Sequence, residues 1–419
     1  MVENRSGANA PKTQERTRID GIDAARALAV LGMFAVHVSV DSIGLLDPDG
    51  AGQAVHDLAR GNSSALFAFL AGLSLALMTG RTRPLSGEPL RLVAVKVLTR
   101  ALVIGLLGLV LDVLAVPVAI ILTYYAGFFV LALPLVKLRA GALVSAAVGL
   151  AAVGPPLSFL LRQDLVAPRT PQGALTSPAE FLLTGYYPAI TFMVFVFAGM
   201  AVGRLDLGAT VTRVRLLVTG AALTVFGYAG SWVALHVFGG LDRLAQGAGS
   251  SLGYPAAVAQ DPQLRENLRE QVMEEAYSIS GQVPTDSWWW LAVGTPHTGT
   301  HFEMAEAVGQ ALLVLVVCLW LAERARVLMY PLTSVGRMPL TVYTGHLLVL
   351  AVVVGVLGPM DWYTPWLMEG LVLGAVVFAV AWRLLLGRGP LERFLASCAD
   401  NVALIHQENR RDRSRPPAS

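Results

Sequence analysis

The chain has 419 residues, of which 55% are hydrophobic and only 14% are charged. Soluble domains carry about 25% charged residues, so a water-soluble core cannot account for this composition. The composition therefore predicts an all-α, polytopic integral membrane protein with the lipid bilayer as its solvent, and no nucleic-acid partner is expected. Cys318 lies in an apolar run and Cys398 in a polar one, which does not indicate a disulfide framework.

Ten apolar runs predict about ten transmembrane helices, because each is long enough to span, or nearly span, a hydrocarbon core of roughly 30 Å. They are residues 24–45, 63–80, 98–116, 120–137, 140–161, 185–203, 212–237, 303–323, 335–357 and 365–386. Residues 1–22 are expected to be a disordered cytoplasmic tail, 23–395 one transmembrane domain and 396–419 a polar cytoplasmic tail.

The distribution of basic residues predicts the orientation of these segments. Placing the N-terminus inside puts 25 of the 31 Lys and Arg residues on the cytoplasmic side. Cytoplasmic loops carry the excess of positive charge, so both termini are expected to be cytoplasmic, with the protein in the plasma membrane.

The first segment carries the strongest candidate site. Arg26 and His37 are 11 residues apart, which is close to three helical turns, and Asp23 lies on the same stripe. Their axial separation is roughly 16 Å, which sets a cation at the membrane edge and an imidazole near mid-bilayer. An ionisable group at that depth indicates function. The alternatives are an arginine that snorkels to the headgroups and a histidine bonded to a neighbouring helix.

The second and sixth segments resemble each other. Leu66-Phe-Ala-Phe-Leu-Ala-Gly72 is echoed by Met193-Val-Phe-Val-Phe-Ala-Gly199, and the two runs end at Gly80-Arg81 and Gly203-Arg204. Such an echo is expected of a parallel internal repeat, although apolar helices also resemble each other by composition alone.

The third segment adds two charged candidates. Arg100 lies at its inner end. There it either contacts phosphates or is only one of the basic residues that set the membrane orientation. Asp112 has apolar neighbours on both sides and needs a partner or water, and His37 is one candidate partner.

The large polar segment 238–302 is expected to be an extracytoplasmic loop. Within it, residues 262–278 predict a polar surface helix, and Trp288, Trp289 and Trp290 are typical of an interfacial belt.

Two later groups of polar residues complete the candidates. His297 and His301 have a spacing that would suit zinc on a helix, but Pro296 and Gly299 predict a turn, so we expect no metal. Tyr343 and His346 share a helix face, where they line a polar cavity or form an interhelical hydrogen bond. No Walker, Rossmann, haem or His-Glu-x-x-His motif occurs.

The motif that begins at Arg26 and ends at His37 resembles the Arg-x10-His signature of the acyltransferase-3 type of membrane acyltransferases. A wider set of pieces is similar to the related heparan-α-glucosaminide N-acetyltransferase family, in a bacterial branch. These pieces are residues 18–26, Ala65–Gly72, Gly185–Thr191, Ala198–Arg204, Thr295–Thr300 and Val335–Tyr343.

The resemblance implies an acyltransferase that moves an acyl group, such as acetyl, from acyl-CoA to an extracytoplasmic sugar or glycolipid. Acyl-CoA would be a co-substrate, and no permanently bound cofactor is expected. Arg26, aided by Asp23 and Arg100, would hold phosphates. His37 would act as general base or nucleophile, and Asp112 would support it. His297, Tyr343 and His346 would line the substrate cavity.

The glucosaminide branch usually carries Asn where this chain has His37, and its catalytic histidine follows in the first outer loop. His56, beside Asp57, is the candidate at that place. Its alternative is a solvated loop histidine. A proton-coupled transporter or flippase would use the same buried polar residues, and a non-catalytic membrane partner and a homo-oligomer stay open.

Overall fold

The computed structural model describes residues 19–38, 44–45, 48–164, 177–253, 261–358 and 366–413. Each of the ten predicted segments contains a helix. These helices are α1 Asp20–His37, α3 Asn62–Met78, α4 Gly87–Asp112, α5 Leu122–Ala132, α6 Ala140–Leu161, α7 Ala189–Gly203, α8 Thr210–Trp232, α12 His301–Arg324, α14 Pro339–Leu357 and α15 Leu367–Leu385. The described residues contain no strand, so the prediction of an all-α protein is confirmed.

Seven helices of the described residues are long and apolar enough to cross a membrane. The helices α5 and α7 are apolar but shorter. The chain is therefore a polytopic membrane protein. Helix α1 ends at His37 and not at residue 45 as expected, so His37 lies at the end of its helix and not midway along it.

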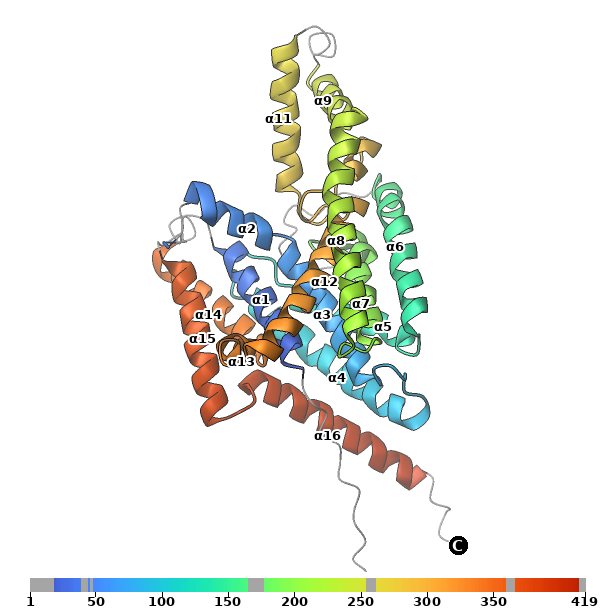
Figure 1. Cartoon of the computed structure of the whole chain (residues 1–419), viewed down its shortest axis with the longest axis vertical. Helices are drawn as coiled ribbons and strands as arrows, with labels where there is room; N and C mark the ends of the chain where they lie inside the picture. Colours follow the sequence, from blue (N-terminus) through green and yellow to red (C-terminus); the bar gives the residue numbers. More distant parts are fainter. Residues whose placement is uncertain are drawn as a thin grey trace, which may run out of the picture.

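The helices differ in what covers them. In α1, α3 and α7 most residues are buried. In contrast, α4, α8 and α15 expose apolar side chains such as Leu102, Val225 and Leu373, as helices that face lipid do. The sites described below therefore lie in the middle of the bundle, between the least exposed helices (Figure 1).

Helices α3 and α7 pack so closely that only glycine fits at their crossing. A Cβ on Gly72 would collide with the carbonyl oxygen of Val196, and one on Gly199 would collide with that of Phe69. The two contacts are reciprocal, because Gly72 and Phe69 occupy the places in the second segment that Gly199 and Val196 occupy in the sixth. This symmetry supports the predicted internal repeat, with small residues at the helix interface.

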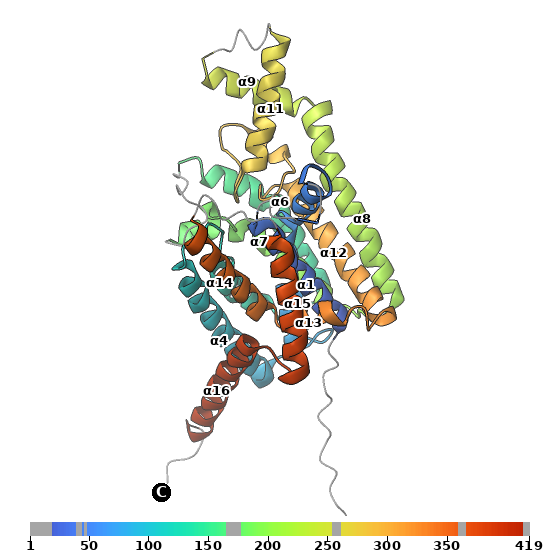
Figure 2. The same ribbon diagram turned by 90° about the vertical axis from the view of Figure 1, so that its left-hand side faces the viewer.

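A small helical subdomain stands above the bundle (Figures 1 and 2). It contains α9 Gly240–Ser251, the 3₁₀ turn Trp288–Ala292 and α11 Pro262–Ser278, and α11 confirms the helix predicted there. Its own apolar core includes Leu244, Val272 and Trp290. Trp290 is buried and its Nε1 donates to Asp286, so it is not the interfacial side chain that the sequence suggested.

Three further helices are α2 Gln53–Ala59, α13 Tyr330–Gly336 and α16 Pro390–Arg413. Residues 396–413 of the predicted polar tail belong to α16, which crosses beneath the bundle (Figure 1). The start of α1 and the end of α16 lie at the same end of the bundle, opposite α9 and α11 (Figures 1 and 2). This end is called inner below and the other end outer.

Candidate active site

A large cavity opens at the inner end of α1. It has a volume of about 1050 Å³ and is lined by residues of α1, α3, α4, α5 and the start of α16. Four arginines line it, against the two acids Asp23 and Glu392. The arginines are Arg26, Arg81, Arg100 and Arg388. Phe67, Leu70 and Phe129 supply apolar walls, so the cavity combines positive charge with apolar surface.

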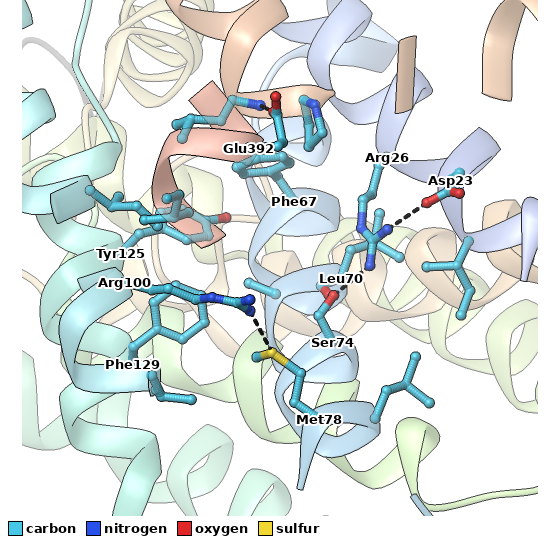
Figure 3. A pocket seen from close by; sticks show the side chains of 18 of the residues that line it. Asp23, Arg26, Phe67, Leu70, Ser74, Met78, Arg100, Tyr125, Phe129 and Glu392 are labelled. Carbon is cyan, nitrogen blue, oxygen red and sulfur yellow. Dashed lines mark hydrogen bonds and ion pairs between the residues drawn. The ribbon is translucent and has the colours of Figure 1, made fainter. Parts of the chain in front are cut away.

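Arg26 is fixed in this cavity by two side chains. Its Nη1 donates to Asp23 Oδ1 at 2.6 Å, and its Nη2 donates to Ser74 Oγ at 2.7 Å (Figure 3). Asp23 is fully buried, and Arg337 Nε lies 3.6 Å from its other oxygen. The carboxylate therefore stabilises and orients Arg26 at the wall of the cavity.

Arg100 faces Arg26 across the cavity (Figure 3). Its Nη1 donates to Met78 Sδ at 2.8 Å, and a thioether is a weak acceptor. Its Nε is buried and has no hydrogen-bond partner among the described residues. The guanidinium thus keeps donors for a ligand with stronger acceptors.

Arg81 and Arg388 are cavity residues that the sequence did not single out. Both stood among the basic residues that define topology, and no local pattern separates a ligand-binding arginine from a topological one. The turn that carries Arg81 is held by Arg204, a buried arginine that donates to the carbonyl oxygens of Ala76 and Arg81, both at 2.9 Å. Arg204 therefore supports the inner cavity without entering it.

His37, at the other end of α1, is paired with a second histidine. Its Nδ1 lies 2.9 Å from His346 Nε2, and the two rings are nearly parallel. Phe34 stacks on His346 at 4.4 Å between ring centroids, and Tyr343 contacts it edge-on at 5.0 Å. His346 and Tyr343 are buried and line neither cavity, so the hydrogen bond between helices, one of the two alternatives, is the one observed.

The histidine pair couples two tautomers, because one nitrogen must donate and the other must accept. When His37 Nδ1 donates to His346, its Nε2 carries a lone pair and can take a proton. When His346 donates, His37 Nε2 carries the proton and can give it. The pair can therefore switch His37 between base and acid.

Asp112 is not the partner of His37. It lies half-buried at the end of α4 and lines neither cavity, while the hydrogen bond of His37 goes to His346. The expected contact is therefore wrong in this structure. The sequence could not place it, because helical periodicity relates residues of one helix only, and both α4 and α14 are separate helices from α1.

A second, smaller pocket lies at the outer end of α1, with a volume of about 220 Å³. It brings together three of the predicted residues, His37, His56 and His297, with Arg60 between them in the lining. Tyr186 and Tyr187 close another side. Apart from His37, these histidines and tyrosines come from three segments, namely α2, the loop before α7 and the loop before α12, which only the fold assembles.

His297 lies in a turn, as Pro296 and Gly299 predicted. Its φ of 62° is in the left-handed region, and its carbonyl oxygen accepts from Gly281 N at 2.7 Å. Burial, with a smaller contribution from Arg60, lowers the pKa of His297 to about 3. His297 is therefore a neutral side chain of the pocket.

His56 and Arg60 connect this pocket to the surface. His56 Nδ1 lies 3.7 Å from Asp57 Oδ1, and Arg60 Nη2 donates to the carbonyl oxygen of Tyr277 in α11 at 2.5 Å. The outer subdomain thus contacts the pocket through Arg60.

The fold and these two cavities define a polytopic α-helical membrane protein with a cationic inner site and a histidine-rich outer site. Comparison with known families matches residues 18–234, more than half of the chain, to the family described as "Heparan-alpha-glucosaminide N-acetyltransferase, catalytic". The chain belongs to this family, as the resemblance implied, and is an acetyltransferase-like membrane enzyme. Residues 278–399 match a family described as "Protein of unknown function (DUF418)".

A search of curated proteins found no match.

The two matched regions contribute different parts of the site. The first carries Arg26, His37 and His56, whereas the second carries His297 and His346. The hydrogen bond between His37 and His346 therefore joins the two regions at the centre of the site.

Proposed function

We propose that the protein transfers an acyl group, such as acetyl, from acyl-CoA in the inner cavity to an extracytoplasmic carbohydrate or glycolipid in the outer pocket. The observation that carries the proposal is that α1 supplies both sites, with Arg26 in the cavity and His37 in the pocket. Their axial separation of roughly 16 Å is comparable to the length of a pantetheine arm.

The inner cavity has the chemistry that the donor requires. Coenzyme A carries its phosphates at one end, and arginine forks bind phosphate oxygens in a bidentate manner. Arg26 and Arg100 face each other across a space with the volume of a ligand site, beside apolar walls for the rest of the molecule. This arrangement supports phosphate binding at the inner end of α1.

The outer pocket has the chemistry that the transfer requires. His37 Nε2 takes the proton of the acceptor amine or hydroxyl while the acceptor atom bonds to the thioester carbonyl carbon. The carbon–sulfur bond then breaks, its electron pair leaves with the coenzyme A sulfur, and His37 returns the proton to that sulfur. His346 holds His37 in the orientation and tautomer for both steps.

The two sites are separate cavities. Phe34 lies one turn inward of His37 on α1 and stacks on His346, and no described residue lines both cavities. A passage beside α1 would therefore have to open for the pantetheine arm to bring the thioester to His37.

The test is turnover of labelled acyl-CoA by the purified protein in detergent, offered amino sugars and glycolipids as acceptors. An acyltransferase forms labelled acyl product without any ion gradient. Acceptor uptake into proteoliposomes without acyl-CoA, with no acyl product in detergent, would overturn the proposal and favour a transporter.

A further inference from the structure

Helix α16 presents three distinct faces. One face is made of small residues and is buried against the bundle, where α16 packs on α4. These residues are Ala396, Ala399 and Ala403. A second face exposes Ser397 together with Leu404, seven residues further along. Because one apolar face already packs on α4, any further apolar face on α16 needs a different partner.

A third face is apolar and uncovered. Phe394, Val402 and Ile405 are 57%, 42% and 56% exposed, and Cys398 is half-buried between them. Their spacing of four, four and three residues places all four on one stripe of the helix. The stripe runs along the length of α16 and points away from the alanine face by about a third of a turn.

The surroundings of the stripe identify its partner. Helix α16 follows α15 after a short turn, and the inner end of α15 exposes Leu384 and Leu385 to the lipid side. Figures 1 and 2 show α16 crossing the inner end of the bundle, at the level where the spans end. The apolar stripe therefore continues the lipid-facing surface of α15.

Exposed basic residues lie near both ends of α16. Arg393 is exposed at its first turn, and Arg410 near its end and Arg91 of the neighbouring α4 both lie beside Glu88. Basic residues that flank an apolar helix face attract anionic headgroups. We propose that α16 is an interfacial helix whose stripe of Phe394, Cys398, Val402 and Ile405 inserts into an anionic leaflet.

The same helix forms part of the inner cavity. Arg388, just before α16, and Glu392 line the cavity, and Glu392 accepts from Leu340 N at 2.8 Å and from Thr341 Oγ1 at 2.6 Å. At its middle, Asp400 pairs with Lys96 of α4 at 2.6 Å. Membrane contact by α16 would thus place the cavity mouth at headgroup level. The proposal itself does not rest on the acyltransferase reaction.

The native Cys398 allows a direct test. The full-length protein, with Cys318 replaced by Ala, is labelled at Cys398 with a polarity-sensitive fluorophore in nanodiscs of phosphatidylcholine and phosphatidylglycerol. The matched control carries the label one residue away on the second face, as Ser397→Cys with Cys398→Ala. We expect blue-shifted emission and quenching by spin-labelled lipid at position 398, and water-like emission without lipid quenching at 397.

Three outcomes would overturn the proposal. One is equal, water-like emission at both positions. Another is protection of position 398 without lipid quenching, together with thiol crosslinking of two copies, which would assign the stripe to a second copy of the chain. The third is unchanged quenching in nanodiscs of phosphatidylcholine alone, which would remove the anionic partner. As a check on the whole stripe, Phe394→Glu with Ile405→Glu should shift the emission at 398 toward water, whereas Ser397→Glu should not.

Discussion

The inner cavity and the outer pocket lie at opposite ends of α1 but are built from different side chains. The inner cavity has about 1050 Å³ and four arginines, whereas the outer pocket has about 220 Å³ and three histidines. Arginine stays charged and suits the binding of a polyanion, while histidine exchanges protons near neutral pH. The difference fits the proposal that one site binds the donor and the other performs the transfer, and each prediction below changes one site and leaves the other intact.

The largest effect is expected at His37. General-base assistance contributes typically 10²–10⁴-fold, so His37→Ala and His37→Gln should reduce acyl transfer by at least about a hundredfold. Binding of acyl-CoA and the melting temperature should stay near wild type, because Arg26 and the inner cavity are unchanged. If the melting temperature falls while turnover per folded molecule is retained, His37 has only a structural role in packing.

The next largest effect is expected at Arg26. Arg26→Ala should weaken acyl-CoA affinity by one to two powers of ten, about 1.4–2.8 kcal/mol. Arg26→Lys should restore part of the affinity, because a lysine supplies a point charge in place of a bidentate hydrogen-bond donor. Titration of the folded variants with acyl-CoA measures this, and an unchanged affinity in Arg26→Ala would remove Arg26 from the donor site.

His346 should act only through His37. By analogy with groups that orient metal-bound histidines, His346→Leu should lower transfer about 10–100-fold. His346→Gln should retain more activity, because its amide can replace the hydrogen bond to His37 Nδ1. The pH–rate profile is the decisive readout, since a purely packing role predicts no shift of the profile in His346→Gln.

The last prediction concerns stability, and not transfer, and it follows from His297 and pH. Its pKa is lowered to about 3. Below pH 6.5, His297 is therefore protonated in the unfolded chain but stays neutral in the folded protein. This opposes folding increasingly as pH falls from about 6.5 toward 3, at about 1.4 kcal/mol per pH unit. The melting temperature of His297→Asn, which tolerates the positive φ, should therefore fall less steeply than wild type over this range. Identical slopes would contradict the burial of a neutral His297.

Much of the fold could be predicted from the sequence because the bilayer imposes simple rules. All ten predicted segments contain helices, and 140–161 matches α6 at both ends. Helix α16 could not be predicted as more than a polar tail. Along the sequence, charged residues stand between the members of its alanine face and between those of its apolar stripe. Its character depends on the packing against α4.

The site was predictable where its residues share one helix. The spacing of Arg26 and His37 placed them on one stripe, and the structure puts them at two cavities. The hydrogen-bond partner of His37 lies 309 residues away along the chain, so periodicity could not identify it. Arg81 and Arg388 were hidden among the topological arginines, because binding and the positive-inside rule use the same residue type.

The central claim is that donor and acceptor are bound on opposite sides of the membrane and meet across α1. Sealed vesicles of known protein orientation test it, because acyl-CoA does not cross the bilayer. Labelled acyl-CoA and an impermeant acceptor are supplied on the same side or on opposite sides. The account predicts acyl product only when acyl-CoA is on the side of Arg26 and α16 and the acceptor is on the side of His297. Equal rates with both substrates on one side would contradict it.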